Sequence, residues 1–219
     1  MNQVLAEKIA KELRISINQV VREYWEMLIL KELSQLELGD FLIFGDGTAL
    51  RLSYGSPRFS DDLDFYLKKK LSFSKFKKQI ERLAEKLEIE ITDLAEKRFT
   101  LLAEFKIKEN YLKLPFRIKI EIRKKIFKRD FETRLLSSPT VNFQVLMFVV
   151  SFEKMKELKE AALKSRNEPR DLFDLWFICQ KLKIPFQPKV QISSKKLKQE
   201  LSKYLPADFK KVIDSLIKK

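Results

Sequence analysis

Apolar residues at helical spacing begin the chain, and glycine-containing breaks and shorter apolar runs follow them. A spacing of three to four residues between apolar positions is typical of an amphipathic helix, whereas a short continuous apolar run is typical of a buried strand. The pattern predicts a helix through Leu5, Ile9 and Leu13, a helix over residues 17–36, a strand over 41–44, a turn at 45–47, a short helix over 49–52 and a strand that carries Asp62 and Asp64.

The rest of the chain gives a second group of elements. It predicts a helix over 73–87 capped by Ser72, strands over 89–92, 99–107 and 116–123, an apolar segment over 141–150, and helices that open near Ser151 and at Pro169, the latter capped by Asn167. The last part of the chain is lysine-rich and helical in pattern. Because Ser138-Pro139 marks the change of pattern, we expect an α+β fold in two parts. These are N-terminal helices with a small mixed-sheet core over 1–136, and a helical C-terminal region over 137–219 that completes the site.

Composition narrows the class of protein. Hydrophobic residues make up 45% of the 219 residues and include 18 phenylalanines, which is enough for a buried core. The formal charge of +14 is typical of a nucleic-acid-binding protein and also of a lysine- and glutamate-rich thermophile surface. Histidine is absent, which excludes Ser-His-Asp hydrolysis and His-ligated zinc. The single cysteine, Cys179, and the lack of any apolar stretch near the roughly 18–20 residues of a membrane span predict a cytoplasmic protein with no membrane partner.

Two carboxylates stand two residues apart within an apolar run, at Asp62 and Asp64. Side chains at i and i+2 of a strand share a face, so both carboxylates would project together while Leu63 and Phe65 enter the core. Neighbouring carboxylates repel each other, and one pKa should rise unless a cation lies between them. Mg²⁺ suits this position because it binds one or two carboxylates together with substrate phosphates. The pattern therefore indicates a metal-dependent site for phosphate chemistry.

A third carboxylate for such a site would come from another strand, and Glu121 is the candidate. In the alternating segment 116–123 it projects away from the isoleucines at 118, 120 and 122. Its neighbours Lys119 and Arg123 leave a second interpretation open, in which Glu121 is a solvated cross-strand partner.

Three of the four glycines fall between Gly45 and Gly55. A glycine turn before a helix lets backbone amides approach a phosphate, and the helix N-terminus adds a partial positive charge. A turn with two glycines is also common for structural reasons alone.

A helical hairpin near the C-terminus carries the last group of candidate residues. Lys159 and Arg166 lie seven residues apart and so share one helix face, while Arg170 and Asp174 are i, i+4 neighbours that could form an ion pair. The same spacing also fits an amphipathic hairpin with charged outer faces.

In combination these motifs resemble one known family. The chain reads Gly47-Thr48-Ala49-Leu50, Arg58-Phe59-Ser60-Asp61-Asp62-Leu63-Asp64, Lys159, Ala162-Leu163-Lys164-Ser165-Arg166 and Arg170-Asp171-Leu172-Phe173-Asp174. In order, spacing and identity this is similar to the AbiEii/AbiGii toxin nucleotidyltransferases, a branch of the DNA polymerase β-like superfamily. The resemblance implies a polymerase β-like nucleotidyltransferase core followed by a helical region.

The resemblance also implies roles for individual residues. The catalytic residues would be Asp62, Asp64, Lys159 and Asp174; Mg²⁺ or Mn²⁺ would be held by Asp62, Asp64 and Glu121; and the nucleoside triphosphate would be bound by Gly47, Thr48, Ser60, Lys159 and Arg166. Lys159 would contact phosphates, and Asp174 would be a distal carboxylate that completes the site.

The implied activity is transfer of a nucleoside monophosphate from an NTP to RNA. The positive charge favours tRNA as the acceptor, and the family context implies a toxin with a cognate antitoxin. One residue departs from the family pattern, because Asp46 stands where the family has glycine. A carboxylate there would repel the triphosphate, so three interpretations stay open: a weakened or inactive enzyme that binds RNA or an antitoxin, a substitution that tames a toxin, or an additional metal ligand.

Overall fold

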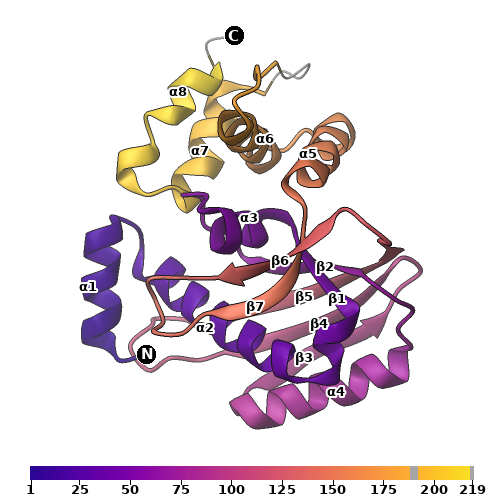
Figure 1. The fold of residues 1–219 in the computed structure, drawn as a ribbon. Helices are drawn as coiled ribbons and strands as arrows, with labels where there is room; N and C mark the ends of the chain where they lie inside the picture. The colour runs from indigo at the N-terminus through magenta and orange to yellow at the C-terminus, as the bar shows by residue number, and fades with distance from the viewer. Residues whose placement is uncertain (188–191, 218–219) are drawn as a thin grey trace.

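A seven-stranded mixed sheet with the strand order β3-β4-β5-β2-β1-β7-β6 forms the centre of the computed structural model, which describes residues 1–187 and 192–217 (Figure 1). The strands are β1 (Leu42–Gly45), β2 (Asp62–Leu67), β3 (Glu90–Glu96), β4 (Thr100–Ile107), β5 (Phe116–Ile126), β6 (Phe131–Leu136) and β7 (Val145–Val150). Strand β2 pairs in parallel with β5, and β1 in parallel with β7, while the other pairs are antiparallel. The sheet confirms the predicted α+β class with a mixed sheet.

Helices lie on both sides of this sheet. They are α1 (Gln3–Leu13), α2 (Ile17–Gln35), α3 (Asp46–Tyr54), α4 (Phe73–Leu87), α5 (Phe152–Arg166), α6 (Pro169–Leu182), α7 (Ser194–Tyr204) and α8 (Val212–Ile217), with short 3-10 segments η1 (Glu37–Phe41) and η2 (Ala207–Phe209). Helices α2 and α4 contact each other and the sheet. Helix α3 lies between the sheet and the C-terminal helices α5–α8, which form a separate layer at the top of the view (Figure 1).

The alternation of β2 places its two kinds of side chain as predicted. Leu63 and Phe65 are fully buried in the core, whereas Asp62 and Asp64 are partly exposed on the opposite face. Full burial of a side chain such as Phe65 contributes about 1.5–3 kcal/mol to stability. Turning the strand over would expose each of its buried side chains to water and lose that contribution for each one. This burial fixes which face of the sheet carries the carboxylates.

Most predicted elements are confirmed, but one cap is wrong, and so is the turn at 45–47, because α3 begins at Asp46 directly after β1. Ser72 accepts from the backbone N–H of Lys75 as the N-cap of α4. Asn167 was expected to cap α6, but it ends α5 in the left-handed conformation (φ 49°), and Glu168 precedes α6 instead. Asparagine is favoured at both kinds of position, and the close succession of the two helices made the assignment ambiguous.

Strand β6 was not predicted, and the sheet includes β7 from beyond the boundary expected at residue 136. The division into 1–136 and 137–219 stays a prediction. The predicted helical pattern of residues 188–191 and 218–219 lies outside the described residues. Within those the structure describes, we find no helix with the length and apolar character that a membrane crossing requires.

Candidate active site

Adjacent parallel strands bring three carboxylates to one place. In the register of β2 and β5, Asp64 lies opposite Glu121, so the two side chains are on the same face as Asp62. All three line a polar pocket of about 120 Å³. The sheet therefore assembles the three candidate metal ligands from two segments far apart in the sequence.

Two basic side chains of β5 form ion pairs with these carboxylates. The Lys119 ammonium lies 3.3 Å from Asp62 Oδ2 and 3.5 Å from Glu121 Oε2. The Arg123 guanidinium lies 3.7 Å from Asp64 Oδ1. Although burial alone would lower it, the pKa of Lys119 is raised by the carboxylates of Asp62 and Glu121.

Asp64 has the most perturbed carboxylate of this group. Burial, and then repulsion from Asp46, Asp62 and Glu121, raises the pKa of Asp64 to about 7, against the opposing effect of Arg123. A bound divalent cation would stabilise the ionised form. The pKa of Asp64 is raised as expected, but burial and Asp46 contribute more to the shift than the neighbouring Asp62 does.

Asp46 begins α3 with a backbone conformation that normally favours glycine (φ 63°). Its carboxylate contacts the Lys159 ammonium, and its Oδ2 atom lies 3.3 Å from Arg123 Nη2. Burial would raise the pKa of Asp46, but Lys159 and Arg123 hold it well below its usual range. The residue that departs from the family pattern is therefore an ionised carboxylate bound to two cations.

Gly47 and Thr48, the next residues of α3, have structural contacts of their own, apart from any role in binding a ligand. A Cβ added at Gly47 would lie 2.2 Å from Nη2 of Arg58 and 3.0 Å from Ser60 Oγ, so a larger residue fits only if the Arg58 guanidinium shifts. The Thr48 hydroxyl donates to the carbonyl oxygen of Asp62 (2.6 Å). Thr48 thereby fixes the backbone at the start of β2.

Helices α5 and α6 place a buried ion cluster beside α3. The Lys159 ammonium lies 2.9 Å from Asp171 Oδ1 and 2.8 Å from Asp174 Oδ2. Asp174 also accepts two bonds from the Arg58 guanidinium (2.7 and 2.8 Å), and Asp171 accepts two from Arg166 (2.5 and 2.8 Å). Lys159 and Arg166 share a helix face as predicted, since both reach Asp171.

One carboxylate oxygen from each of Asp46, Asp171 and Asp174 lies within 4.8 Å of the other two, a spacing that could suit a metal ion. The Lys159 ammonium, however, contacts all three carboxylates. Burial alone would lower the pKa of Lys159, but the three carboxylates raise it, so it stays charged. An ammonium ion therefore already supplies the positive charge at this position.

A larger cavity of about 450 Å³ adjoins the polar pocket and shares Asp46, Arg123, Lys159 and Arg166 with it. Tyr66 of β2 and apolar residues of α5 form its other walls. The two spaces together offer a polar end with carboxylates and cations and a more apolar end.

The structure thus brings most of the predicted site residues together. Asp62, Asp64, Glu121, Ser60, Lys159 and Arg166 line the polar pocket, while Gly47, Thr48 and Asp174 lie buried behind it. The possible ion pair of Asp174 with Arg170 is replaced by its pairs with Arg58 and Lys159. Sequence reasoning gave no role to Arg58 or Asp171, although both lie within the quoted motifs.

A mixed sheet with paired aspartates beside a glycine-containing helix start is the arrangement expected of a nucleotidyltransferase. The chain belongs to the AbiEii family, described as "Nucleotidyl transferase AbiEii toxin, Type IV TA system", which matches residues 28–210. This match confirms the resemblance. The chain is a nucleotidyltransferase, and its family consists of toxins from toxin–antitoxin systems.

One curated protein and two solved structures are also similar to this chain, and the structures show that the fold is shared. An uncharacterized protein of Aquifex aeolicus, aq_aa25, is 29% identical over 182 residues, which are 81% of this chain and 73% of that protein. The crystal structure of JHP933 from Helicobacter pylori has a TM-score of 0.57 at 22% identity, covering 76% of this chain and 68% of its own. A second H. pylori structure, of a protein provisionally assigned as a nucleotidyltransferase, has a TM-score of 0.57 at 23% identity, with 76% and 70% covered.

Proposed function

We propose that the chain moves a nucleoside monophosphate from an NTP to a hydroxyl of an RNA acceptor, with tRNA the favoured class. The observation that carries this proposal is the polar pocket that holds Asp62, Asp64 and Glu121 beside Lys119, Arg123 and Lys159. Carboxylates can bind metal ions and cations can bind phosphates, and a nucleotidyltransferase needs both in one pocket.

The donor set fits a divalent ion. Asp62, Asp64 and Glu121 present hard oxygen ligands on one face of adjacent strands. The pKa of Asp64 is raised first by burial and then by repulsion from neighbouring carboxylates, and a bound Mg²⁺ or Mn²⁺ would favour the ionised form. When bound, such an ion would neutralise charge on the attacking and leaving oxygens.

The proposed reaction is attack of an acceptor hydroxyl on the α-phosphorus of an NTP. The acceptor oxygen forms a bond to the α-phosphorus, the bond from that phosphorus to the bridging oxygen breaks, and pyrophosphate leaves as the acceptor loses its proton. Lys159, Arg123 and Arg166 face the polar pocket and would bind phosphate oxygens. Most of the catalysis would come from positioning and from neutralising charge in a fixed environment.

Asp174 acts in this proposal as a positioning residue. It is fully buried and binds both Arg58 and Lys159, so it holds the lysine at the pocket from behind. Arg58 in turn packs against Gly47, which links this cluster to the start of α3.

The choice of RNA rests on charge. A net charge of +14 favours a polyanionic acceptor over a small uncharged one. Type IV toxin–antitoxin membership implies a cognate antitoxin as a further partner of this chain.

Asp46 supports a second candidate, a catalytically impaired protein that binds RNA or an antitoxin on the same scaffold. Its carboxylate occupies Lys159 and Arg123, two of the cations that a triphosphate would use. This alternative predicts a folded protein that binds partners and does not turn over.

The test is transfer of label from each α-³²P-NTP to total tRNA with Mg²⁺. Asp64→Asn and Glu121→Gln remove charge from candidate metal ligands at little change in shape, and Asp40→Asn does the same at an exposed site. We expect the wild type and Asp40→Asn to label RNA and the two site variants to lose labelling. No labelling with any NTP by folded wild type would favour the second candidate.

A further inference from the structure

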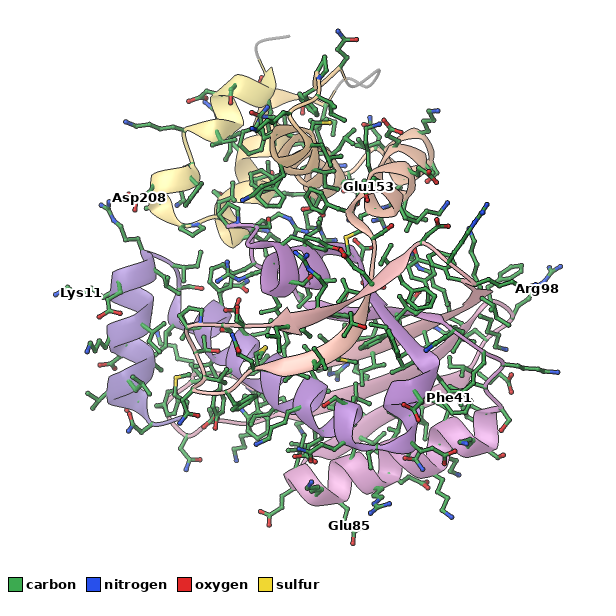
Figure 2. The ribbon with its side chains drawn as sticks, viewed as in Figure 1. Lys11, Phe41, Glu85, Arg98, Glu153 and Asp208 are labelled. Atoms are coloured by element: carbon green, nitrogen blue, oxygen red, sulfur yellow. The ribbon has the colours of Figure 1, made fainter. Side chains whose placement is uncertain are left out.

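The end of the sheet at which β5 finishes carries an unusual concentration of basic residues. Residues near it, from the β3–β4 turn and the end of β5 onward, include Lys97, Arg98, Lys124, Lys125, Lys128 and Arg129. Of these, only Lys124 lies within 4 Å of a carboxylate among the described residues, that of Glu96 at 2.7 Å. In Figure 2, Arg98 projects at the outer edge of the molecule, on the side opposite Lys11 of α1.

An exposed aromatic ring lies among these charges. Phe99 is 69% exposed, and the Arg98 guanidinium lies 4.9 Å from its ring centroid. The backbone N–H of Lys124 donates to the carbonyl oxygen of Phe99 (2.9 Å), which holds the backbone of Phe99 beside the end of β5. An exposed aromatic ring among basic side chains offers a flat face on which a base can stack, next to cations that can bind phosphates.

This surface is continuous with the active site. A cavity of about 460 Å³ is lined by Phe99, Thr100, Arg123, Lys124 and Lys125, and Arg123 also lines the polar pocket. Thr100 lies opposite Arg123 in the register of β4 and β5, two residues beyond the pair of Leu102 and Glu121. At about 3.3 Å per residue, the backbone of Phe99, one residue before Thr100, therefore lies about 10 Å along the strands from the level of Glu121.

We propose that this surface binds the single-stranded end of the RNA acceptor, with a base near the reactive hydroxyl stacked on Phe99 and its phosphates bound by the basic residues. An aromatic ring that stacks on bases, within a basic groove that follows the backbone, is the general means of binding single-stranded nucleic acid. Arg123 would join this groove to the site of transfer. The inference rests on the proposed function, from which it takes the identity of the acceptor.

The test is binding of a fluorescein-labelled RNA hairpin with a four-nucleotide 3′ tail, measured by anisotropy without NTP. Phe99→Ala should weaken binding by about 5- to 100-fold, as expected for loss of one stacked base. Leu114→Ala is the matched control, because Leu114 is 77% exposed at the opposite end of the β4–β5 hairpin and should have no effect. Lys125→Glu should weaken binding and reduce the log–log salt slope by about 0.7 for one lost contact, whereas Lys113→Glu, in the β4–β5 connection, should not.

Equal binding by Phe99→Ala and Leu114→Ala would overturn the proposal, as would equal affinity for tailed and blunt hairpins. So would binding of an acidic protein partner, but not RNA, that depends on Phe99. The assay uses no transfer step, so it separates the two proposals. Dependence on Phe99 without any labelling would leave the surface standing and refute the activity, and labelling unaffected by Phe99→Ala would do the reverse.

Discussion

In the proposed activity the carboxylate of Asp46 would compete with substrate phosphates for Lys159 and Arg123, and removing its charge is the most direct test of the site. Asp46 contacts Lys159 and lies 3.3 Å from Arg123. Asp46→Asn keeps the size of the side chain and removes the charge, whereas Asp46→Gly restores the family residue and also relieves the positive φ. We expect both variants to bind a nucleoside triphosphate more tightly than the wild type.

The size of the effect follows from simple electrostatics. Two unit charges 4 Å apart interact by about 4 kcal/mol at an effective dielectric of 20. Because Lys159 and Arg123 neutralise part of the carboxylate, we expect a half or less of this repulsion to remain, or about 1.5–2 kcal/mol, which is a 10- to 30-fold gain in affinity. Lys159 keeps Asp171 and Asp174 as partners, so neither variant leaves a buried ammonium unpaired.

Calorimetric titration with a non-hydrolysable NTP analogue and Mg²⁺ measures this gain. Asp40→Asn is the control for a general change in charge, because Asp40 is exposed in η1. Unchanged affinity in Asp46→Asn would refute competition for the cations. A loss of metal binding in that variant would identify Asp46 as a metal ligand and contradict the argument. A gain in Asp46→Gly alone would trace the effect to the backbone rather than the charge.

Four further predictions concern the stability of the site and the titration of Asp64. Asp174→Asn should lower the free energy of unfolding by about 3–5 kcal/mol, because it removes the buried counter-charge of Arg58. Asp208→Asn is the control, because Asp208 belongs to an exposed ion pair and its loss should cost less than about 1 kcal/mol. Equal losses of stability for the two variants in urea denaturation would contradict this prediction. Gly47→Ala should cost about 1–3 kcal/mol because its methyl group would meet Arg58 at 2.2 Å, and an unchanged melting temperature would show that the guanidinium can move freely. Mg²⁺ affinity should rise as the pH increases through about 7, where Asp64 loses its proton, and calorimetry at pH 6 and 8 would refute this if the affinities were equal. The pKa of Asp64 is higher in the folded than in the unfolded chain, so without metal the folded state loses stability as the pH rises from the unfolded-state pKa through about 7. Asp64→Asn cannot titrate there, so the stability of this variant should not show that decrease.

Local features of the fold could be predicted from the sequence because they depend on nearby residues. The cap at Ser72 and the division of β2 between Leu63 and Asp64 both follow from spacing of two or three residues. Asn167 shows the limit of such reasoning, since capping preferences alone do not say which of two adjacent helices the residue belongs to.

The assembly of the site could not be predicted in the same way. Glu121 lies beside Asp64 only because β2 and β5 pair in parallel in one register, and a shift of one residue would turn it to the other face. Lys119 and Arg123 alternate with the isoleucines of β5 as Glu121 does. They could therefore have been assigned to the same face as Glu121 once the register was known. Arg58 gave no such signal, because its partner Asp174 is more than a hundred residues away in the chain.

The contacts of the C-terminal helices indicate that they do more than cover the sheet. The backbone N–H of Phe59 donates to the carbonyl oxygen of Tyr204 (2.9 Å), and the Tyr204 hydroxyl donates to Asp61. Arg58, in the same short segment, binds Asp174 of α6. The residues that lead directly into Asp62 are thus held by α6 and by the end of α7. The position of the paired aspartates therefore depends on helices that supply no carboxylate to the candidate metal site, and a change that loosens those helices should reduce transfer even where β2 itself is intact.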